Sequence, residues 1–337
     1  MKALIFDGFG KLLRSAVCPD PVPARDEVVL KICRCGICGS DLHMTEDPVF
    51  ALEQGAVIGH EFAGEVVETG ADVRNLRVGD LVAAAPLRGC GSCAACRAGT
   101  PAWCENGMTL IGGGFGQYTA LADHQLRKLP DGISLADGAL AEPLAVALHG
   151  VLRSGLKPGA RVLVVGAGAI GLAVVYWARR MGARAIVAAD LNDFQRDRAE
   201  DLGATGFITS GPDMKQRVAS ACGGAPDIVF ECVGKVGLID HCIDLVRPQG
   251  TVCVLGLCTG TDTLDSFRAI SKEVTVIMSV FFNMHEFTTA IDALDAGRYA
   301  PQALVSDVVG LSDAPAAFEA LRSRTTQCKV LIDPFFD

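Results

Sequence analysis

The sequence predicts an α/β protein in which a β-rich domain accompanies a doubly wound parallel sheet. Three observations support this fold class. Short strand-like segments separated by turn residues fill residues 1–142, apolar strands alternate with helical stretches from about residue 143, and a glycine-rich turn joins a strand to a helix near residue 166. With 337 residues, the chain is long enough for two domains, each with its own core.

The first 142 residues contain short segments with the composition of strands, for example 27–32 and 62–68. Val-Gly-Asp at 78–80 and Pro-Asp-Gly at 130–132 are turn sequences between such segments. We therefore expect a β-rich first domain, and we expect the apolar segment 328–333 to form a strand that rejoins it.

The middle of the chain contains apolar segments separated by helical stretches. Continuous apolar strands of this kind indicate a parallel sheet with both faces covered by helices. One helix is predicted over 170–182. The predicted strands are 161–165, 185–190, 227–234, 251–257 and 274–280.

A G-x-G-x-x-G motif follows the first of these strands and opens the predicted helix. Its glycines permit a tight turn, a close approach to a pyrophosphate and close helix–strand packing. Asp190 ends the next strand, where a carboxylate bonds ribose hydroxyls and repels a 2′-phosphate, so NAD is favoured over NADP. The alternative is a glycine turn with a surface aspartate. The residues that we assign to the cofactor are Gly166, Gly168, Ile170, Gly171, Asp190, Val233 and Leu257.

Four cysteines with the spacing Cys-x2-Cys-x2-Cys-x7-Cys stand at Cys90, Cys93, Cys96 and Cys104. Four thiolates can close a tetrahedral shell around one zinc ion and leave no position for a substrate. An iron–sulfur cluster is the alternative, but its fourth cysteine would precede a proline or lie far away. Cys104 precedes Glu105, so we expect a structural zinc lobe at about 88–106.

A second set of metal-binding residue types lies outside this lobe. Cys38 stands in CGICGSDLH, His60 and Glu61 in VIGHEFAGEV, and Glu142 in AEPLAVALHG. A thiolate, an imidazole and a carboxylate form a partial shell for a catalytic zinc that keeps one position open. Each residue alone has an ordinary structural explanation, whereas their joint presence favours a metal site.

The composition excludes several kinds of partner. A formal net charge of −9 argues against nucleic acid and anionic membranes, because both require basic surfaces. We find no apolar run of about 20 residues and no signal-peptide pattern at the start MKALIF. Fourteen cysteines then indicate metal thiolates in a reducing compartment. We expect a cytoplasmic protein.

The motifs occur in the order seen in zinc-dependent medium-chain alcohol dehydrogenases, which the sequence resembles along essentially its whole length. They are CGICGSDLH, GHEFAGEV, VGDLV, the four-cysteine lobe, AEPLAVALHG and VLVVGAGAIG. Glu142 makes the chain most similar to the polyol, 2,3-butanediol and threonine dehydrogenase branch. The resemblance implies that Cys38, His60, Glu61 and Glu142 surround a catalytic zinc. Family members differ over which glutamate ligates it directly.

The resemblance also implies a fold and a mechanism. Residues 1–142 and 281–337 would form a GroES-like catalytic domain, and 143–280 a Rossmann NAD-binding domain, with the active site between them. Zinc would lower the pKa of a substrate hydroxyl, and hydride would pass to NAD, leaving a ketone. Ser40 would accept the hydroxyl proton and His43 would pass it to solvent. The chain would hold two zinc ions and form a homodimer or homotetramer, with 274–280 as a suitable edge strand.

The substrate stays open. A secondary alcohol or vicinal diol is the leading hypothesis, and threonine or a sugar polyol is the alternative. The apolar residues at 48–52 and 281–282 would suit an apolar alcohol if they line the pocket, but packing of the interior explains them equally well. A zinc-free reductase, a non-catalytic NAD-binding sensor and a zinc-dependent nucleic-acid module fit the sequence less well. The metal motifs argue against the zinc-free reductase, and the intact relay residues argue against the sensor. The acidic net charge argues against the nucleic-acid module.

Overall fold

A computed structural model describes residues 1–295 and 299–336 of the chain. The chain divides into two compact units. Unit 1 comprises Met1–Glu142, Asn283–Asp295 and Val305–Asp337, and unit 2 comprises Pro143–Phe282 and Ala296–Leu304. Within the described residues, no helix has the length and apolar composition needed to cross a membrane.

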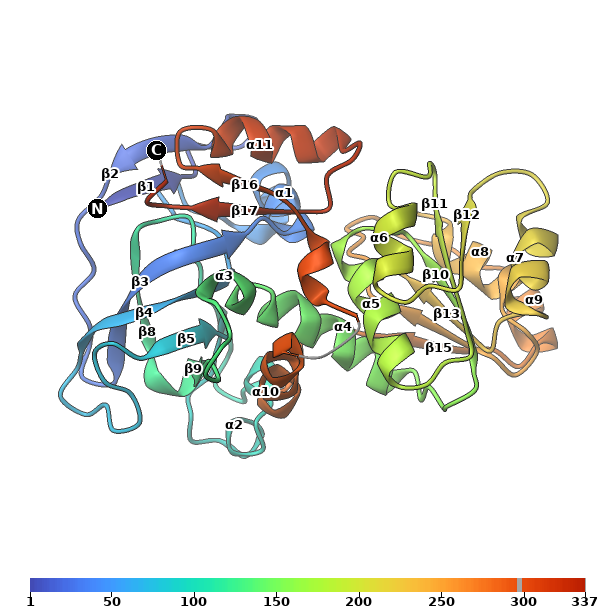
Figure 1. Cartoon of the computed structure of the whole chain (residues 1–337), viewed down its shortest axis with the longest axis horizontal. Coiled ribbons are helices and arrows are strands. Elements are labelled where there is room, and N and C mark those ends of the chain that lie inside the picture. The colour runs from blue at the N-terminus through green and yellow to red at the C-terminus, as the bar shows by residue number, and fades with distance from the viewer. Residues whose placement is uncertain (296–298, 337) are drawn as a thin grey trace. The chain divides into compact units, whose positions relative to one another are not determined.

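Unit 1 is built on a seven-stranded sheet (Figure 1). Six strands follow the order β16-β17-β3-β4-β5-β9, and β8 pairs with β3. Two small sheets, β1–β2 and β6–β7, accompany it. The strands are β1 (Lys2–Ile5), β2 (Arg14–Val17), β3 (Glu27–Gly36), β4 (Glu61–Thr69), β5 (Leu81–Ala84), β6 (Leu87–Arg88), β7 (Thr109–Leu110), β8 (Tyr118–Ala122), β9 (Leu126–Lys128), β16 (Val305–Gly310) and β17 (Lys329–Asp333).

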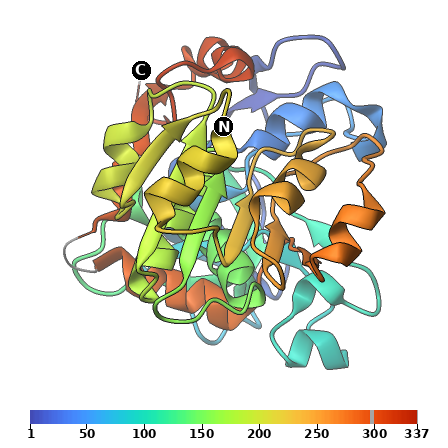
Figure 2. The same ribbon diagram turned by 90° about the vertical axis from the view of Figure 1, so that its right-hand side faces the viewer.

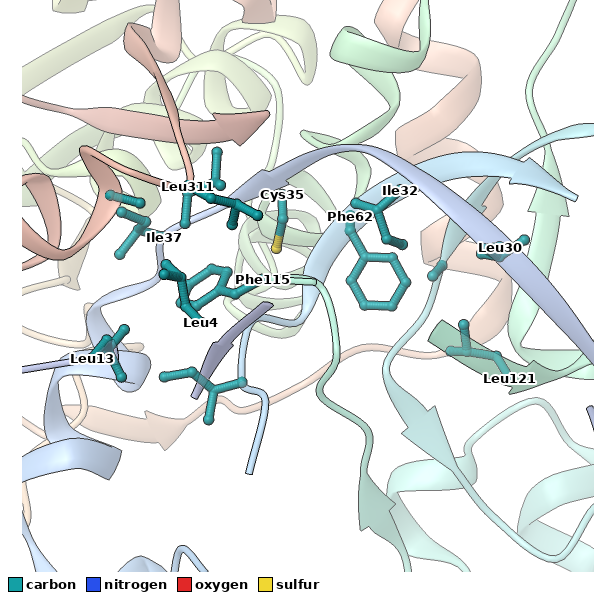
Figure 3. Packing of buried hydrophobic residues seen from close by; sticks show 14 of the residues in the cluster. Leu4, Leu13, Leu30, Ile32, Cys35, Ile37, Phe62, Phe115, Leu121 and Leu311 are labelled. Atoms are coloured by element: carbon teal, nitrogen blue, oxygen red, sulfur yellow. The ribbon is translucent and has the colours of Figure 1, made fainter. Parts of the chain in front are cut away.

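The core of unit 1 gathers apolar side chains from strands that are far apart in sequence. Leu30 and Ile32 of β3 point to the buried face, whereas Lys31 between them is exposed, which is the alternation expected of a half-buried strand. Figure 3 shows Leu30 and Ile32 in one buried cluster with Phe62 and Phe115. Burying one such side chain stabilises the fold by about 1.5–3 kcal/mol.

Helices connect the strands of unit 1, and local sequence explains where several begin. Asn283 caps α10 by accepting from the backbone N–H groups of His285 and Glu286, and the Glu286 carboxylate accepts from the Asn283 N–H in return. The helices of unit 1 are α1 (Gly39–Glu46), α2 (Ala94–Arg97), α3 (Leu135–Gly138), α10 (Met284–Asp292) and α11 (Ala314–Ala320), and α4 (Ala141–Arg153) begins in unit 1 and continues into unit 2. The 3₁₀ helices of unit 1 are η1 (Pro48–Phe50), η2 (Pro101–Trp103), η3 (Asp123–Gln125), η4 (Ala293–Asp295) and η6 (Leu321–Ser323), whereas η5 (Pro301–Leu304) belongs to unit 2.

Unit 2 contains a six-stranded parallel sheet in the order β12-β11-β10-β13-β14-β15. This is the order of a doubly wound dinucleotide-binding sheet, and Figure 2 shows helices in front of its strands. The strands are β10 (Arg161–Val165), β11 (Ala185–Asp190), β12 (Gly206–Thr209), β13 (Ile228–Glu231), β14 (Thr251–Val254) and β15 (Thr275–Met278). The helices are α5 (Ala169–Arg180), α6 (Arg196–Asp201), α7 (Met214–Cys222), α8 (Leu238–Leu245) and α9 (Ser266–Ser271).

The predicted fold class is confirmed: a β-rich unit accompanies a parallel α/β unit. The predicted segment 274–280 contains β15 at one edge of the sheet, and 328–333 contains β17, which pairs with β3. The structure adds β12 and β16, which the sequence pattern does not predict. Strand β16 lies at the edge of its sheet and is half exposed, so it lacks a continuous apolar run.

Candidate active site

Two neighbouring strands bring the predicted catalytic ligands together. Gly36 at the end of β3 pairs with Glu61 at the start of β4, so the residue after each strand end lies near the other strand. As a result, ligand atoms of Cys38, His60 and Glu61 all lie within 4.8 Å of one another. No other ligand residue joins this group among the described residues, so Glu142 stands outside it.

Asp41 in the first turn of α1 holds two of these residues in place. Its Oδ2 accepts a hydrogen bond of 2.9 Å from the Cys38 backbone N–H, and its Oδ1 lies 3.2 Å from Nδ1 of His60. Burial opposes charge on His60, but the Asp41 carboxylate raises the pKa of His60 well above its ordinary value. A carboxylate on one imidazole nitrogen orients the other for a metal. Nothing in the sequence pattern singled out Asp41.

Lys329 is a second residue that the sequence pattern does not reveal. From β17, its Nζ lies 2.7 and 2.5 Å from the two carboxylate oxygens of Glu61 and donates to the Ile37 carbonyl at 3.0 Å. Burial opposes charge on Lys329, but Glu61 raises the pKa of the ammonium group above its ordinary range. The Glu61 carboxylate also needs Gly36, because a Cβ there would lie 2.1 Å from Oε2.

Glu142 lies in the first turn of α4 and is buried. Burial raises its pKa to about 7, and the charge on Glu61 acts in the same direction, whereas His60 and Lys329 act against it. These electrostatic interactions indicate that Glu142 faces the same group of residues, although its carboxylate lies farther from the other ligand atoms.

The two predicted relay residues occupy one helix. Ser40 and His43 both lie on α1, three residues apart, so they share a helix face. The Ser40 Oγ lies 3.4 Å from Nε2 of His60, the nitrogen opposite Asp41. Within the described part of the chain, no hydrogen bond joins the Ser40 and His43 side chains. The structure therefore brings Ser40 to the ligands and leaves His43 nearby.

The apolar segment at 48–52 contributes one residue to a cavity beside these ligands. Leu52 lines a cavity of about 170 Å³ that His60 and Asp41 also line. Val49 is exposed and Phe282 is buried. Of the apolar residues at 48–52, only Leu52 therefore lines this cavity.

The four-cysteine lobe brings its sulfur atoms together in the same way as the first site. The Sγ atoms of Cys90, Cys93, Cys96 and Cys104 lie within 4.8 Å of one another. The lobe's own polar groups donate to these sulfurs from the Cys90, Cys93 and Cys96 backbone N–H groups, the Ser92 hydroxyl and the Asn106 amide. Hydrogen bonds from Ser92 and Asn106 lower the pKa of Cys90 to about 5. Such donors stabilise thiolates, which are the form that binds zinc.

In unit 2, the glycine motif forms the turn between β10 and α5. Gly166 has a φ of +95°, which favours glycine, and a Cβ on Gly171 would lie 1.8 Å from the Gly166 carbonyl oxygen. Asp190 ends β11 and its Oδ2 accepts from the Ala167 N–H at 3.0 Å. The turn, the helix N-terminus and the acid therefore meet at the carboxyl ends of the strands, as a dinucleotide site requires.

The loops after β13 and β14 lie beside this turn. A Cβ on Gly166 would meet Val233, and a Cβ on Gly234 would meet the backbone of Leu257. The buried Glu231 fixes the first loop, because its Oε1 accepts from the N–H groups of Val233 and Gly234 at 2.7 and 2.9 Å. The sequence predicts Val233 and Leu257 at the cofactor but gives no signal for Glu231.

Comparison with known proteins gives a consistent result. Residues 24–131 match the family model for the alcohol dehydrogenase GroES-like domain, and residues 169–296 match that for zinc-binding dehydrogenase. A sorbitol dehydrogenase of Bacillus subtilis is 30% identical over 326 residues, which cover 93% of this chain and 92% of the relative.

Two solved structures carry a bound cofactor. An alcohol dehydrogenase of Escherichia coli complexed with NADH has a TM-score of 0.89 and 25% identity, with 99% of each chain covered. A zinc-binding dehydrogenase of Sinorhizobium meliloti bound to NADP has a TM-score of 0.86 and 31% identity, again with 99% of each chain covered.

Proposed function

Because the chain belongs to the zinc-dependent medium-chain alcohol dehydrogenases, in the branch of the polyol dehydrogenases, we propose that it oxidises a secondary alcohol or vicinal diol with NAD and releases a ketone. One observation carries the proposal: the ligand atoms of Cys38, His60 and Glu61 lie within 4.8 Å of one another. The set combines a soft thiolate, an imidazole and a carboxylate, which is a donor set that suits zinc and leaves a position for substrate.

A bound zinc ion would supply Lewis-acid polarisation of the substrate hydroxyl. The protein's own residues do the rest of the proton chemistry. Asp41 orients the His60 ring, Lys329 holds the Glu61 carboxylate, and Ser40 accepts the substrate proton at Oγ. His43, on the same face of α1, passes that proton to solvent. Glu142, whose pKa is about 7, supplies a further carboxylate to the site.

NAD would supply the hydride acceptor. The backbone of Gly166–Gly171 receives the pyrophosphate, and Val233 and Leu257 flank the rest of the cofactor. The Asp190 carboxylate at the end of β11 favours ribose hydroxyls over a 2′-phosphate. The solved relatives include one with NADH and one with NADP, so kcat/KM with each cofactor tests the assignment directly. A higher kcat/KM with NADP would contradict it.

The test of the catalytic assignment is Cys38→Ser. Wild-type protein should contain about two zinc ions per chain, one in each site, and the variant should contain about one. NAD-dependent alcohol oxidation should be lost, while the four-cysteine zinc remains. Cys328→Ser, at a cysteine outside both metal sets, is the matched control and should keep both ions. Unchanged turnover in Cys38→Ser would refute the catalytic site.

The remaining assignments concern the whole protein. Residues 1–142 and 281–337 act as the catalytic domain, with a structural zinc lobe at about 88–106, and 143–280 act as the NAD-binding domain. The protein works in the cytoplasm as a homodimer or homotetramer, joined through the β15 edge. Its substrate is a small molecule, and the net charge of −9 argues against binding of nucleic acid. A panel of small diols, cyclic alcohols, sugar polyols and threonine, followed by NADH absorbance, identifies the substrate.

A further inference from the structure

A cavity of about 260 Å³ lies beside the four-cysteine lobe, within unit 1. Arg97, His124 and Arg127 line it, and none of the other described residues that line it carries a carboxylate. None of these three residues belongs to either metal set or to the cofactor set. Two guanidinium groups and an imidazole thus meet around one cavity in a chain whose net charge is −9.

Neither guanidinium group has an acidic partner among the described residues. Arg127 is half-buried, and its Nη1 donates to the carbonyls of His124 and Leu126 at 3.0 and 2.8 Å. Its Nε and Nη2 make no hydrogen bond within residues 1–295 and 299–336. Burial lowers the pKa of Arg127, and no carboxylate offsets this cost. Arg97 is exposed and forms no ion pair with any described residue.

Two other arginines of unit 1 have acidic partners. Arg34 lies 2.5 Å from Asp333 and Arg88 lies 2.6 Å from Glu27. His124 does face an acid, because the Oδ1 of Asp123 lies 4.0 Å from its Nδ1. A half-buried guanidinium with free donors gains most from an external oxyanion, whose oxygens match its planar fork.

Neutralisation of the zinc thiolates is the other explanation for these cations, since Cys96 also lines the cavity. The hydrogen bonds to the cysteine sulfurs argue against it. They come from backbone N–H groups, Ser92, Asn106 and the cysteines themselves, and none comes from Arg97 or Arg127. The hydrogen bonds to the cysteine sulfurs thus come from within the lobe, and the guanidinium groups of Arg97 and Arg127 are available to a ligand in the cavity.

We propose that this cavity is a binding site for a small oxyanion, a phosphate or carboxylate group of a metabolite, held by Arg97, Arg127 and His124. The volume exceeds that of one phosphate, so the rest of the ligand has room beside Leu87 and Met284. The inference is independent of the alcohol that the enzyme oxidises.

The test is calorimetric titration of the full-length, zinc-loaded protein with inorganic phosphate and, separately, with acetate. Saturating NAD blocks the pyrophosphate site, and any binding that the cavity variants leave unchanged is assigned to another anion position, such as the open position of the catalytic zinc. One site per chain is expected, and the tighter of the two probes distinguishes a phosphate from a carboxylate ligand. Arg127→Gln and Arg97→Gln should each weaken binding at least about tenfold, because each removes a charge-assisted contact.

Arg74→Gln is the matched control, because Arg74 also donates from Nη1 to two local carbonyls without an acidic partner but lines neither cavity. Its affinity should equal that of wild type. Absence of saturable binding to wild type, or wild-type affinity in both cavity variants, overturns the proposal. Loss of zinc from Arg127→Gln would assign the guanidinium to the lobe instead. If that variant does not fold, the exposed Arg97 provides the decisive comparison.

Discussion

The ammonium group of Lys329 lies 2.7 and 2.5 Å from the oxygens of Glu61, and both side chains are buried. Removing one member of such a pair leaves a charge that neither water nor a partner solvates, which costs more than the pair itself contributes. Gly36 makes the arrangement possible, because it leaves space for the Glu61 carboxylate. The missing side chain of Gly36 and the ammonium group of Lys329 therefore fix the orientation of the Glu61 carboxylate, a candidate metal ligand.

Lys329→Met should therefore lower the free energy of unfolding by about 3–5 kcal/mol, measured by urea denaturation of the zinc-loaded protein. Lys128→Met is the control, because the Lys128 pair with Asp80 is partly exposed and such pairs contribute about 1 kcal/mol or less. Equal decreases in the free energy of unfolding in the two variants would show that the buried pair contributes no more than the exposed one.

At the scale of elements, the carboxylate of Asp227 joins the starts of two parallel strands to the segment that follows a helix. Asp227 precedes β13, and its oxygens accept from the Arg161 backbone N–H at the start of β10 and from Nε of Arg247 after α8. Burial acts against ionisation of Asp227, but the hydrogen bonds from Arg161 and Arg247 hold its pKa well below the ordinary value. The amino ends of two strands and the end of a helix are thus joined electrostatically.

This contact predicts a pH dependence of stability. A carboxyl group with a lowered pKa in the folded state stabilises the fold above its unfolded pKa, about 3.9, and loses that contribution as the pH falls towards the folded pKa. Asp227→Asn should therefore be less stable than wild type at pH 7, and the difference in urea midpoint should shrink below about pH 4.

Asp197→Asn, at an exposed residue in the first turn of α6, is the control and should show a smaller difference, because that carboxylate interacts with the helix dipole in solvent. A gap between wild type and Asp227→Asn that stays constant down to acid pH would mean that Asp227 contributes through packing rather than charge.

At the scale of the whole molecule, β15 leaves one edge of the parallel sheet exposed. Met278 and Val276 on this strand are exposed, and unpaired edges with apolar side chains readily pair with a second copy. If two copies pair through the β15 edge, Met278→Lys should place a charge between them and lower the mass measured by light scattering. Val17→Lys, on the exposed strand β2 of unit 1, should leave the mass unchanged. A monomeric wild type would remove the basis of this prediction.

Much of the fold and of the candidate sites could be predicted from the sequence, because their signals are local. Cys90–Cys104, His60–Glu61 and the glycine motif each lie within one short segment whose spacing indicates the chemistry. Lys329 could not be predicted, because its partner lies 268 residues away and CKVLID has the composition of an ordinary buried strand. Glu231 could not be predicted either, because it closes an apolar strand and acts through backbone N–H groups.

The origin of Lys329 in β17 also affects the timing of biosynthesis. Glu61 and Lys329 are separated by 268 residues, and a ribosome adds about 5–20 residues per second. Glu61 therefore exists for roughly 13–54 seconds before its cationic partner is synthesised. During that interval β3 also lacks β17 as a neighbour. The candidate metal ligands near the start of the chain thus reach their final arrangement only after synthesis of unit 2, so the candidate site is assembled late during translation.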